Sequence, residues 1–392
     1  MRGRGTPALP RAQMFHVEHG EQNLTAAPIC DTREGVAPLS FHRPELDDGD
    51  ALRRIVAGAR AVNSDLAWVN LLLLAPKYDT EIALEDGVLY RHYGDRARLC
   101  GYTFPCAPSL LDSGDEALRR AEAALRRLEE DARERGRALR FCLLSPAEKE
   151  RLERLRPGAW RFHCARGNDD YLYRRSDLAE LPGTAYHAKR NHVSRFLRDH
   201  ADAEAEPLHE GNVDAFREVA EAWLDSMSSA AGGSPRALQH EWRAIDAALR
   251  LRAPLSLEGT LLRVGGRPAA MALTSFISPS VADVHYEKCH PDFRGAYALI
   301  NRETARRLSS AELINREEDL GLEGLRQAKL SYKPCRLVEK WDALPADSEE
   351  DFPGASPTAA EAPEAESRRE EEDAKGAAAS CPPELSTPAA PA

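Results

Sequence analysis

Two stretches in which apolar and polar residues alternate around a turn predict β-hairpins in the two halves of the chain. The first is TEIALEDGVLYRHYG at 80–94, with an Asp-Gly turn, and the second is EGTLLRVGGRPAAMALTSF at 258–276, with a Gly-Gly turn. Alternation with a period of two is typical of strands, and such dipeptides are typical of hairpin turns. Each half is therefore expected to contain a β-sheet.

The same order of elements follows each hairpin. In the first half the pattern predicts a strand, a polar helix, a strand, a helix and a strand at 97–103, 114–135, 138–144, 146–156 and 169–175. In the second half it predicts a strand, a helix, a strand, a helix and a strand at 281–288, 296–308, 311–315, 321–331 and 335–341. We therefore predict an α+β fold of two similar halves, each a mixed β-sheet flanked by helices, with the site in a cleft between them.

Composition distinguishes the ends of the chain from its body. Between residues 346 and 392 there are twelve Asp and Glu but only three Lys and Arg, so this segment carries −9 of the formal net charge of −11. Few large apolar residues occur there, which is typical of disorder. We expect a disordered leader at 1–39, with Met14 as a second candidate start, two acyltransferase-like halves at 40–176 and 177–345, and a disordered acidic tail at 346–392.

Several classes of protein are disfavoured by the sequence. The longest apolar run, LAWVNLLLLAP at 66–76, is shorter than the roughly 20 residues of a membrane helix, so no membrane insertion is expected. The eight cysteines contain no CxxC pair, which indicates reduced thiols and a soluble, cytoplasmic protein. His187 and His192 are five residues apart, which does not fit a helical metal pair, so no metal is assigned.

Three ionisable residues alternate along the predicted strand VADVHYEK. A period of two places Asp283, His285 and Glu287 on one face of this strand. The strand could be a solvated edge strand, on which such alternation is common. It could also form a polar cleft wall in which a carboxylate or histidine takes a proton from an attacking amine.

A candidate phosphate site precedes the helix that begins near residue 296. Arg294 and Gly295 come directly before this helix, and Tyr297 lies in its first turn. Backbone N–H groups at a helix start, a glycine and an arginine can together hold a phosphate. Alternatively, the glycine only turns the chain into the helix.

A run of cations occurs in YHAKRNHVSRFLRDH at 186–200, within an almost neutral body. Lys189, Arg190 and Arg195 are the residues that we select from it as candidates for donor binding. A basic helix is commonly a solvated face, but it also suits an RNA backbone or an anionic headgroup.

The last predicted helix contains an unexpected lysine. In a helix at 321–331, Lys329 would lie on the same face as Leu322 and Leu325, which places a cation on the apolar stripe. If Lys329 points into a cleft, exchanging it for Met should leave the fold at least as stable while abolishing function.

Three motifs carry a resemblance to a known family. GLEGLRQAKLSYKPCRLVEKW looks like the C-terminal signature of lysylphosphatidylglycerol synthase catalytic domains, and YHAKRNHVSRF and HYEKCHPDFRGAYALINRE are similar to the phosphatidylglycerol lysyltransferase C-terminal-like family. The likeness covers roughly residues 40–342. It implies two tandem halves of the GCN5-related N-acetyltransferase type and kinship with Fem-type aminoacyltransferases. In those relatives the lysine that matches Lys329 lies at the transfer site.

The resemblance implies an acyltransferase or aminoacyltransferase with no permanently bound cofactor. Its co-substrate would be aminoacyl-tRNA or acyl-CoA, and its acceptor a small molecule, a peptide or a lipid headgroup. Only one glycine occurs in the DFRGAYALI loop, which weakens the case for coenzyme A. Two alternatives remain open: an acyl-CoA-dependent N-acyltransferase acting on a small amine or peptide, and a non-catalytic module that binds a ligand or RNA.

Overall fold

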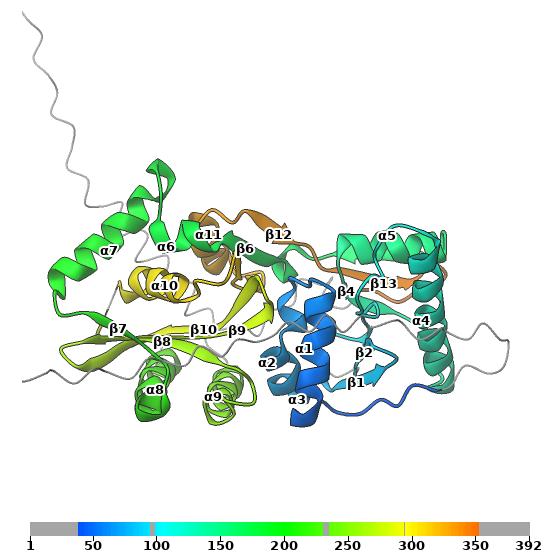
Figure 1. Ribbon diagram of the computed structural model, residues 1–392, viewed down its shortest axis with the longest axis horizontal. Coiled ribbons are helices and arrows are strands. Elements are labelled where there is room, and N and C mark those ends of the chain that lie inside the picture. Colours follow the sequence, from blue (N-terminus) through cyan, green and yellow to red (C-terminus); the bar gives the residue numbers. More distant parts are fainter. Residues whose placement is uncertain (1–37, 95–98, 230–234, 294, 353–392) are drawn as a thin grey trace, which may run out of the picture. The chain divides into compact units, whose positions relative to one another are not determined.

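Two mixed β-sheets form the framework of the protein. The computed structural model describes residues 38–94, 99–229, 235–293 and 295–352 (Figure 1). The first sheet has the strand order β1 (Thr80–Glu85), β2 (Val88–Tyr93), β3 (Gly101–Tyr102), β4 (Phe141–Leu144), β13 (Trp341–Pro345), β5 (Trp160–Cys164). The second has the order β12 (Arg336–Val338), β6 (Asp170–Arg174), β11 (Leu313–Asn315), β10 (Val281–Cys289), β9 (Arg267–Ser278), β8 (Glu258–Val264), β7 (Glu204–Pro207).

The two sheets repeat one arrangement. Each contains a hairpin, β1–β2 or β8–β9, followed by an antiparallel strand, and each has one parallel pair, β3 with β4 or β10 with β11. Both hairpin turns use positive φ angles, at Asp86 and Gly87 in the first and at Gly265 and Gly266 in the second. Such turns match the twist of the flanking strands. The predicted fold class, two similar mixed sheets flanked by helices, is confirmed.

Helices cover both faces of the second sheet. Those of the described chain are α1 (Gly49–Gly58), α2 (Trp68–Leu73), α3 (Ala75–Tyr78), α4 (Asp115–Glu134), α5 (Pro146–Leu155), α6 (Arg175–Glu180), α7 (His187–Asp199), α8 (Val213–Ser229), α9 (Pro235–Arg250), α10 (Ala296–Arg307) and α11 (Glu323–Ser331). Figure 1 shows α10 on one face of this sheet and α8 and α9 on the other. Leu299 of α10 belongs to one apolar core with Leu262, while Phe216 of α8 belongs to another with Leu261. Leu261 and Leu262, which are neighbours in β8, therefore belong to two different apolar cores.

The last strands of the two halves are exchanged. Strand β6 follows β5 in the sequence but lies in the second sheet between β11 and β12, and β13 follows β12 but lies in the first sheet between β4 and β5. The single strand predicted at 335–341 is therefore wrong: it divides into β12 and the start of β13, which belong to different sheets. The proposed boundary at residue 176 does not separate the sheets, because β6 precedes it and pairs beyond it.

The predicted leader and tail lie outside the described residues, apart from 38–39 and 346–352. Within the described ranges, no helix is both long enough and apolar enough to cross a membrane.

Candidate active site

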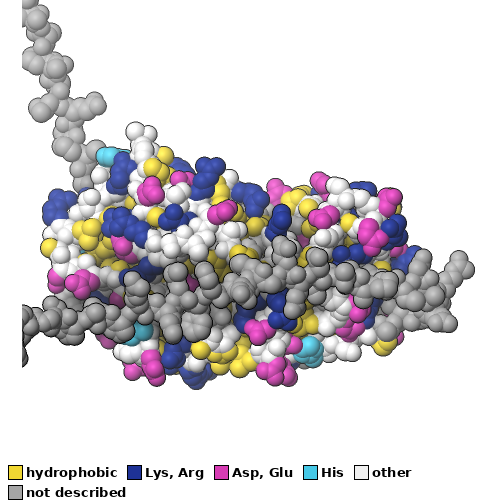
Figure 2. Space-filling view, in the orientation of Figure 1, with side chains coloured by type: hydrophobic (Ala, Val, Ile, Leu, Met, Phe, Trp, Pro, Cys, Tyr) yellow, Lys and Arg dark blue, Asp and Glu magenta, His cyan; other side chains and the backbone are white. Residues whose placement is uncertain are grey.

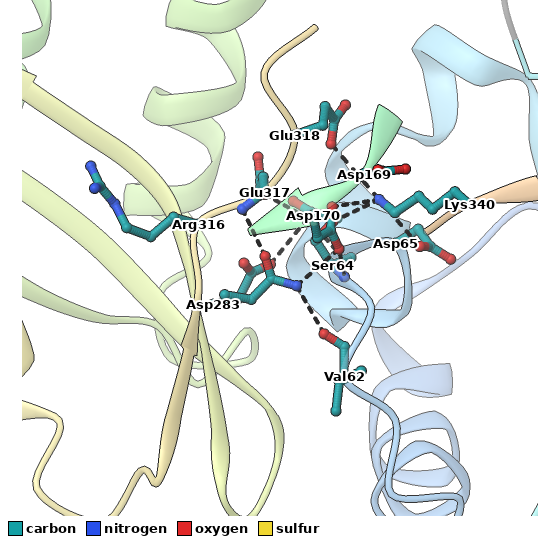
Figure 3. Close-up of polar contacts among 12 residues, drawn as sticks. Val62, Ser64, Asp65, Asp169, Asp170, Asp283, Arg316, Glu317, Glu318 and Lys340 are labelled. Carbon is teal, nitrogen blue, oxygen red and sulfur yellow. Dashed lines mark hydrogen bonds and ion pairs between the residues drawn. The ribbon is translucent and has the colours of Figure 1, made fainter. Parts of the chain in front are cut away.

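An ion pair joins the two exchanged strands where they leave their own halves. Asp170 begins β6, and Lys340 directly precedes β13. Their side chains are almost completely buried, and Nζ of Lys340 lies 2.6 Å from Oδ1 of Asp170 (Figure 3). Asp170 also accepts hydrogen bonds from the backbone N–H and hydroxyl of Ser64, at 2.8 and 3.0 Å, and from the Asn315 amide at 2.9 Å. Both carboxylate oxygens are therefore bonded.

Further charges balance this pair. Nζ of Lys340 lies 3.6 Å from Asp65 and 3.8 Å from Glu318, and Asp65 accepts a hydrogen bond of 2.9 Å from Arg91. Burial by itself lowers the pKa of Lys340, but the negative charges of Asp170, Glu318 and Asp65 outweigh that effect and raise it. We call Asp65, Arg91, Asp170 and Lys340 the exchange cluster. It consists of two acids and two bases.

A second buried cluster lies beside the first and is formed by Asn70, Asp283, His285 and Glu317. Nδ1 of His285 lies 3.2 Å from Oδ1 of Asn70, 3.4 Å from Oδ2 of Asp283 and 3.7 Å from Oε1 of Glu317. The Asn70 amide donates to Glu317 at 2.9 Å and lies 3.4 Å from Oδ2 of Asp283. We call these four residues the Asp283 cluster. No Lys or Arg belongs to it.

Asp283 is poorly compensated in this cluster. Its side chain is completely buried, and its Oδ1 atom has no hydrogen-bond partner among the described residues. Burial raises the pKa of Asp283 well above its ordinary value, and the negative charges of Glu317 and Asp170 raise it further. The proton or another positive charge is therefore favoured at this carboxylate.

A bulge in β10 overturns one part of the sequence interpretation. Asp283 pairs with Ser275, whereas Tyr286 pairs with Leu273 and Glu287 with Ala272, so His285 is an extra residue without a partner in the ladder. Because Ser275 and Leu273 share a face of β9, Asp283 shares a face with Tyr286, and Glu287 lies on the opposite face. The prediction that Asp283, His285 and Glu287 share one face is therefore wrong for Glu287.

Glu287 has different partners from the other two residues. It accepts hydrogen bonds from Asn301 of α10, at 3.2 Å, and from Arg316, at 3.1 Å. His285 remains with Asp283, and its Nε2 atom lies 2.8 Å from the hydroxyl of Ser275. The structure thus brings together two of the three predicted residues.

A small pocket of about 70 Å³ adjoins both clusters. Its polar wall contains Asp65, Asn70, Glu317, Glu318 and the ammonium-bearing Lys340, and its apolar wall includes Leu71 and Leu143. Glu317 and Glu318 have side chains that are 29% and 19% exposed, whereas Asp283 and His285 lie behind them at 0% and 1%. The glutamates are therefore the carboxylates that a small molecule in the pocket would meet first.

Lys329 holds the loop that carries these glutamates. Its buried ammonium group donates to the backbone carbonyls of Arg316, Glu317 and Glu318, at 2.5, 3.3 and 2.7 Å. Burial lowers the pKa of Lys329, and the positive charge of Arg316 lowers it further. The predicted inward orientation is present, but the ammonium group faces the peptide chain. An effect of Lys329 on the pocket would pass through the position of Glu317, whose φ of 56° is unusual for a residue other than glycine.

Those predicted donor-binding residues that the structure describes lie on α7 and at the start of α10, on the other side of the second sheet. Gly295 has a φ of 85° and directly precedes α10, while Tyr297 packs against the core that contains Leu299. Arg294 lies outside the described residues. A helix start with a left-handed glycine is thus present, but Asp283 and His285 face away from it.

The basic helix α7 is only partly available for a ligand. The ammonium of Lys189 lies 3.9 Å from the ring centre of Tyr332, and Arg190 donates to the carbonyls of Leu181 and Gly183. Arg195 is exposed. On the face shown in Figure 2, basic side chains are interspersed with acidic and hydrophobic ones. Arg190 therefore has a local structural contact that its sequence did not suggest.

Sequence reasoning missed Asn70, Glu317, Asp170 and Lys340. Asn70 is the one polar side chain within the apolar run AWVNLLLLA, which is a usable signal. Glu317 and Glu318 follow the carboxyl end of β11, which is parallel to β10, and this end of parallel strands commonly carries sites. For Asp170 and Lys340 we find no comparable local signal, because their partnership depends on the exchange of strands.

The family model described as "Phosphatidylglycerol lysyltransferase, C-terminal" matches residues 61–344. The chain belongs to this family. A conserved protein of unknown function from Bacteroides thetaiotaomicron VPI-5482 is 32% identical and has a TM-score of 0.69, over 78% of this chain and 99% of that chain. This family match confirms the resemblance drawn from the sequence motifs.

More distant relatives show the fold. The structure of L-PGS from Bacillus licheniformis is 12% identical with a TM-score of 0.53, over 78% of this chain and 94% of that chain. This likeness concerns the fold alone. An uncharacterized protein of Mycoplasmoides gallisepticum is 24% identical over 177 residues, which are 44% of this chain and 54% of that protein. The match thus spans about half the length of that curated relative.

Proposed function

We propose that this protein transfers an aminoacyl or acyl group from an activated ester or thioester to an amine or hydroxyl acceptor. The family description names a lysyltransferase, which favours aminoacyl-tRNA over acyl-CoA as the donor. The acceptor would be a small molecule, a peptide or a lipid headgroup. The observation that carries the proposal is the pocket whose polar wall contains Glu317 and Glu318.

The pocket lining has three carboxylates, those of Asp65, Glu317 and Glu318, and one cation, Lys340, so its net negative charge suits an amine. A carboxylate near an ammonium group attracts it, and the attraction is stronger in a partly buried pocket than in water. Either glutamate is exposed enough to take a proton from the amine, whereas Asp283 and His285 are reached only through their neighbours. Of the predicted catalytic residues, Asp283 and His285 would therefore act by orienting Glu317, and Lys329 by holding its loop. We propose that Glu287 holds the Arg316 side chain in place and takes no direct part in the transfer.

The reaction needs no covalent intermediate on the protein. The amine nitrogen, after losing a proton to a pocket carboxylate, attacks the carbonyl carbon of the donor. The new C–N bond forms as the C–O or C–S bond breaks, and the leaving oxygen or sulfur takes up a proton. Alignment of the two substrates can supply much of the rate acceleration in such a reaction.

The donor's phosphates would lie near the start of α10 and along α7. Gly295 allows the backbone to approach an anion closely, and Arg195 is exposed on α7. Arg294, Tyr297, Lys189 and Arg190 remain candidates for this role, although Arg190 contacts backbone carbonyls. A donor bound there must reach the pocket past the edge of the sheet, which calls for a long substrate such as the acceptor end of a tRNA.

A transfer assay with two donors tests the proposal. The purified full chain is incubated with a mixture of labelled aminoacyl-tRNAs or with labelled acetyl-CoA, together with a panel of amines, and labelled products are separated. We expect transfer from aminoacyl-tRNA, and a loss of about 100-fold or more when both pocket glutamates are replaced, as Glu317→Gln with Glu318→Gln.

The matched control is Glu258→Gln, at an exposed position of β8. It should retain wild-type activity. Transfer from acetyl-CoA alone would support the acyl-CoA alternative. Binding of tRNA or CoA without any transfer would support the non-catalytic alternative and contradict the proposal.

A further inference from the structure

The Asp283 cluster has the geometry of a metal site. One ligand atom each from Asp283, His285 and Glu317 lie within 4.8 Å of one another. The two measured distances from Nδ1 of His285, 3.4 Å to Asp283 and 3.7 Å to Glu317, are close to the separation of ligands around zinc. Metal–ligand distances of about 2.0–2.2 Å in a tetrahedron place neighbouring ligand atoms roughly 3.3–3.6 Å apart.

Acceptor atoms outnumber donors in this cluster. The Asn70 side-chain nitrogen has two hydrogens but three acceptors, namely the Ser64 carbonyl at 3.0 Å, Glu317 at 2.9 Å and Asp283 at 3.4 Å. The carboxylate of Asp283 points into the group through Oδ2, and its Oδ1 is buried with no hydrogen-bond partner in the part of the chain that the structure describes. A buried anion without compensation is costly, so the cluster calls for one more positive charge.

The orientation of His285 is set by a further contact. Nε2 of this residue lies 2.8 Å from the hydroxyl of Ser275, so that Nδ1 is the nitrogen that faces the carboxylates. A histidine that binds a metal through one nitrogen commonly donates the proton of the other to a neighbouring acceptor, which fixes its tautomer and orientation. Ser275 is suitably placed for this role.

We propose that Asp283, His285 and Glu317 bind a divalent transition-metal ion at the inner wall of the pocket. One imidazole nitrogen with two carboxylate oxygens fits zinc better than magnesium, which prefers oxygen ligands and retains water. A fourth position is available either to a water molecule from the pocket or to Asn70 after its amide turns. The proposal goes beyond transfer activity, because it depends only on these side chains. With the ion bound to Glu317, Glu318 is the carboxylate left to accept a proton.

Metal binding to the full chain tests this inference directly. The protein is stripped with a chelator, dialysed, and titrated with Zn²⁺ in one series and Mg²⁺ in another, while heat of binding and melting temperature are recorded. Metal content is then measured after gel filtration. We expect one Zn²⁺ per chain, a raised melting temperature and no comparable effect of Mg²⁺.

Substitutions of two proposed ligands, Asp283 and His285, test whether these residues bind the ion. Asp283→Asn and His285→Ala should each raise the Kd for Zn²⁺ by about 100-fold or more, whereas Asn70→Asp should lower it by adding a carboxylate. His209→Ala is the control, since His209 is exposed and lies 3.8 Å from Glu206 at the surface. It should bind Zn²⁺ like the wild type.

Three results would overturn the proposal. These are the absence of stoichiometric Zn²⁺ binding by wild type, an unchanged Kd in a folded Asp283→Asn protein, and loss of the ion in His209→Ala. Circular dichroism of each variant distinguishes loss of the site from loss of the fold. Because the test measures binding of zinc alone, its failure leaves the transfer proposal standing, and failure of the transfer assay leaves this one standing.

Discussion

The exchange cluster and the Asp283 cluster lie side by side and each contains a fully buried aspartate, but the charges around the two aspartates are arranged differently. Asp170 is bonded through both of its oxygens and is paired with Lys340. Asp283 is equally buried, yet one of its oxygens has no hydrogen-bond partner within the described ranges, and its neighbours Glu317 and His285 are not fixed cations. Burial alone therefore does not show whether the charge of an acid is balanced by its neighbours.

The difference lies in whether the positive charge is part of the chain. Lys340 belongs to the segment that connects β12 to β13, so its ion pair with Asp170 forms whenever the exchanged strands are in place. At Asp283 the charge of Lys340 acts only from outside the cluster and does not outweigh burial, so further compensation must come from a proton, a metal ion or a substrate. We interpret the exchange cluster as a structural ion-pair network that joins the halves, and the Asp283 cluster as a binding site.

The largest expected effect comes from making one isosteric change in both clusters. Asp170→Asn leaves Lys340 buried beside a neutral amide, and breaking a buried pair costs about 3–5 kcal/mol of unfolding free energy. Asp283→Asn removes a charge that the metal-free protein compensates only in part, so its stability should stay within about 1 kcal/mol of wild type or increase. Urea unfolding of both variants in the presence of a chelator measures the contrast. Equal losses at the two positions would abolish the distinction between the clusters.

The substitution Lys329→Met tests how much the ammonium group of Lys329 stabilises the loop that carries Glu317 of the Asp283 cluster. Its ammonium donates to three carbonyls of the loop that includes Glu317, so its removal leaves buried acceptors without donors. We expect a loss of about 2–4 kcal/mol, since each such group costs about 1–3 kcal/mol and some will reach water. This replaces the expectation from sequence that the Met variant is at least as stable as wild type. Lys333→Met, at an exposed position, is the control and should unfold like wild type.

The smallest expected effect concerns Glu148, at the border of the exchange cluster. Burial raises the pKa of Glu148 to about 7, although hydrogen bonds from Ser145 and the charge of Arg91 oppose this. In the unfolded chain a glutamate ionises near pH 4.3, so the stabilisation from the folded state's extra proton is complete below about pH 4.3 and is lost as the pH rises through about 7.

Glu148→Gln keeps the side chain neutral at every pH and isolates this contribution. Between pH 5 and pH 8 the unfolding free energy of wild type should fall by about 1–3 kcal/mol relative to that of the variant. Urea unfolding at several pH values measures the difference. A difference that does not change with pH would show that Glu148 ionises normally in the folded protein.

Local patterns predicted what local interactions determine. The hairpins at 80–94 and 258–276 follow from alternation and turn residues, and the limits of α10 differ by one residue from those expected. The burial of Lys329 also followed from its position on a helix face. Its partners did not, because a lysine on a buried face can bond a substrate or a backbone carbonyl equally well.

Interactions between distant segments were beyond the reach of the patterns. The bulge at His285 shifts Glu287 to the other face of the strand. The prediction assumed that side chains alternate between the two faces without interruption, which does not hold where one residue is inserted. In the same way, the pattern of CRLVEKW predicts one strand, because nothing in its composition indicates that its two parts pair in different sheets. Glu317 reached the site through a loop whose path is set by Lys329 and Asn315.

The position of β13 affects how this chain can be assembled during synthesis. In the first sheet this strand lies between β4 and β5, although both of them leave the ribosome long before it. Until residues 341–345 emerge, the facing edges of β4 and β5 lack their final partner, and unpaired edges are the places where strands associate wrongly. The first sheet therefore cannot be completed early in translation, although most of its strands are synthesised early. It can be completed only when almost the whole described chain has been made.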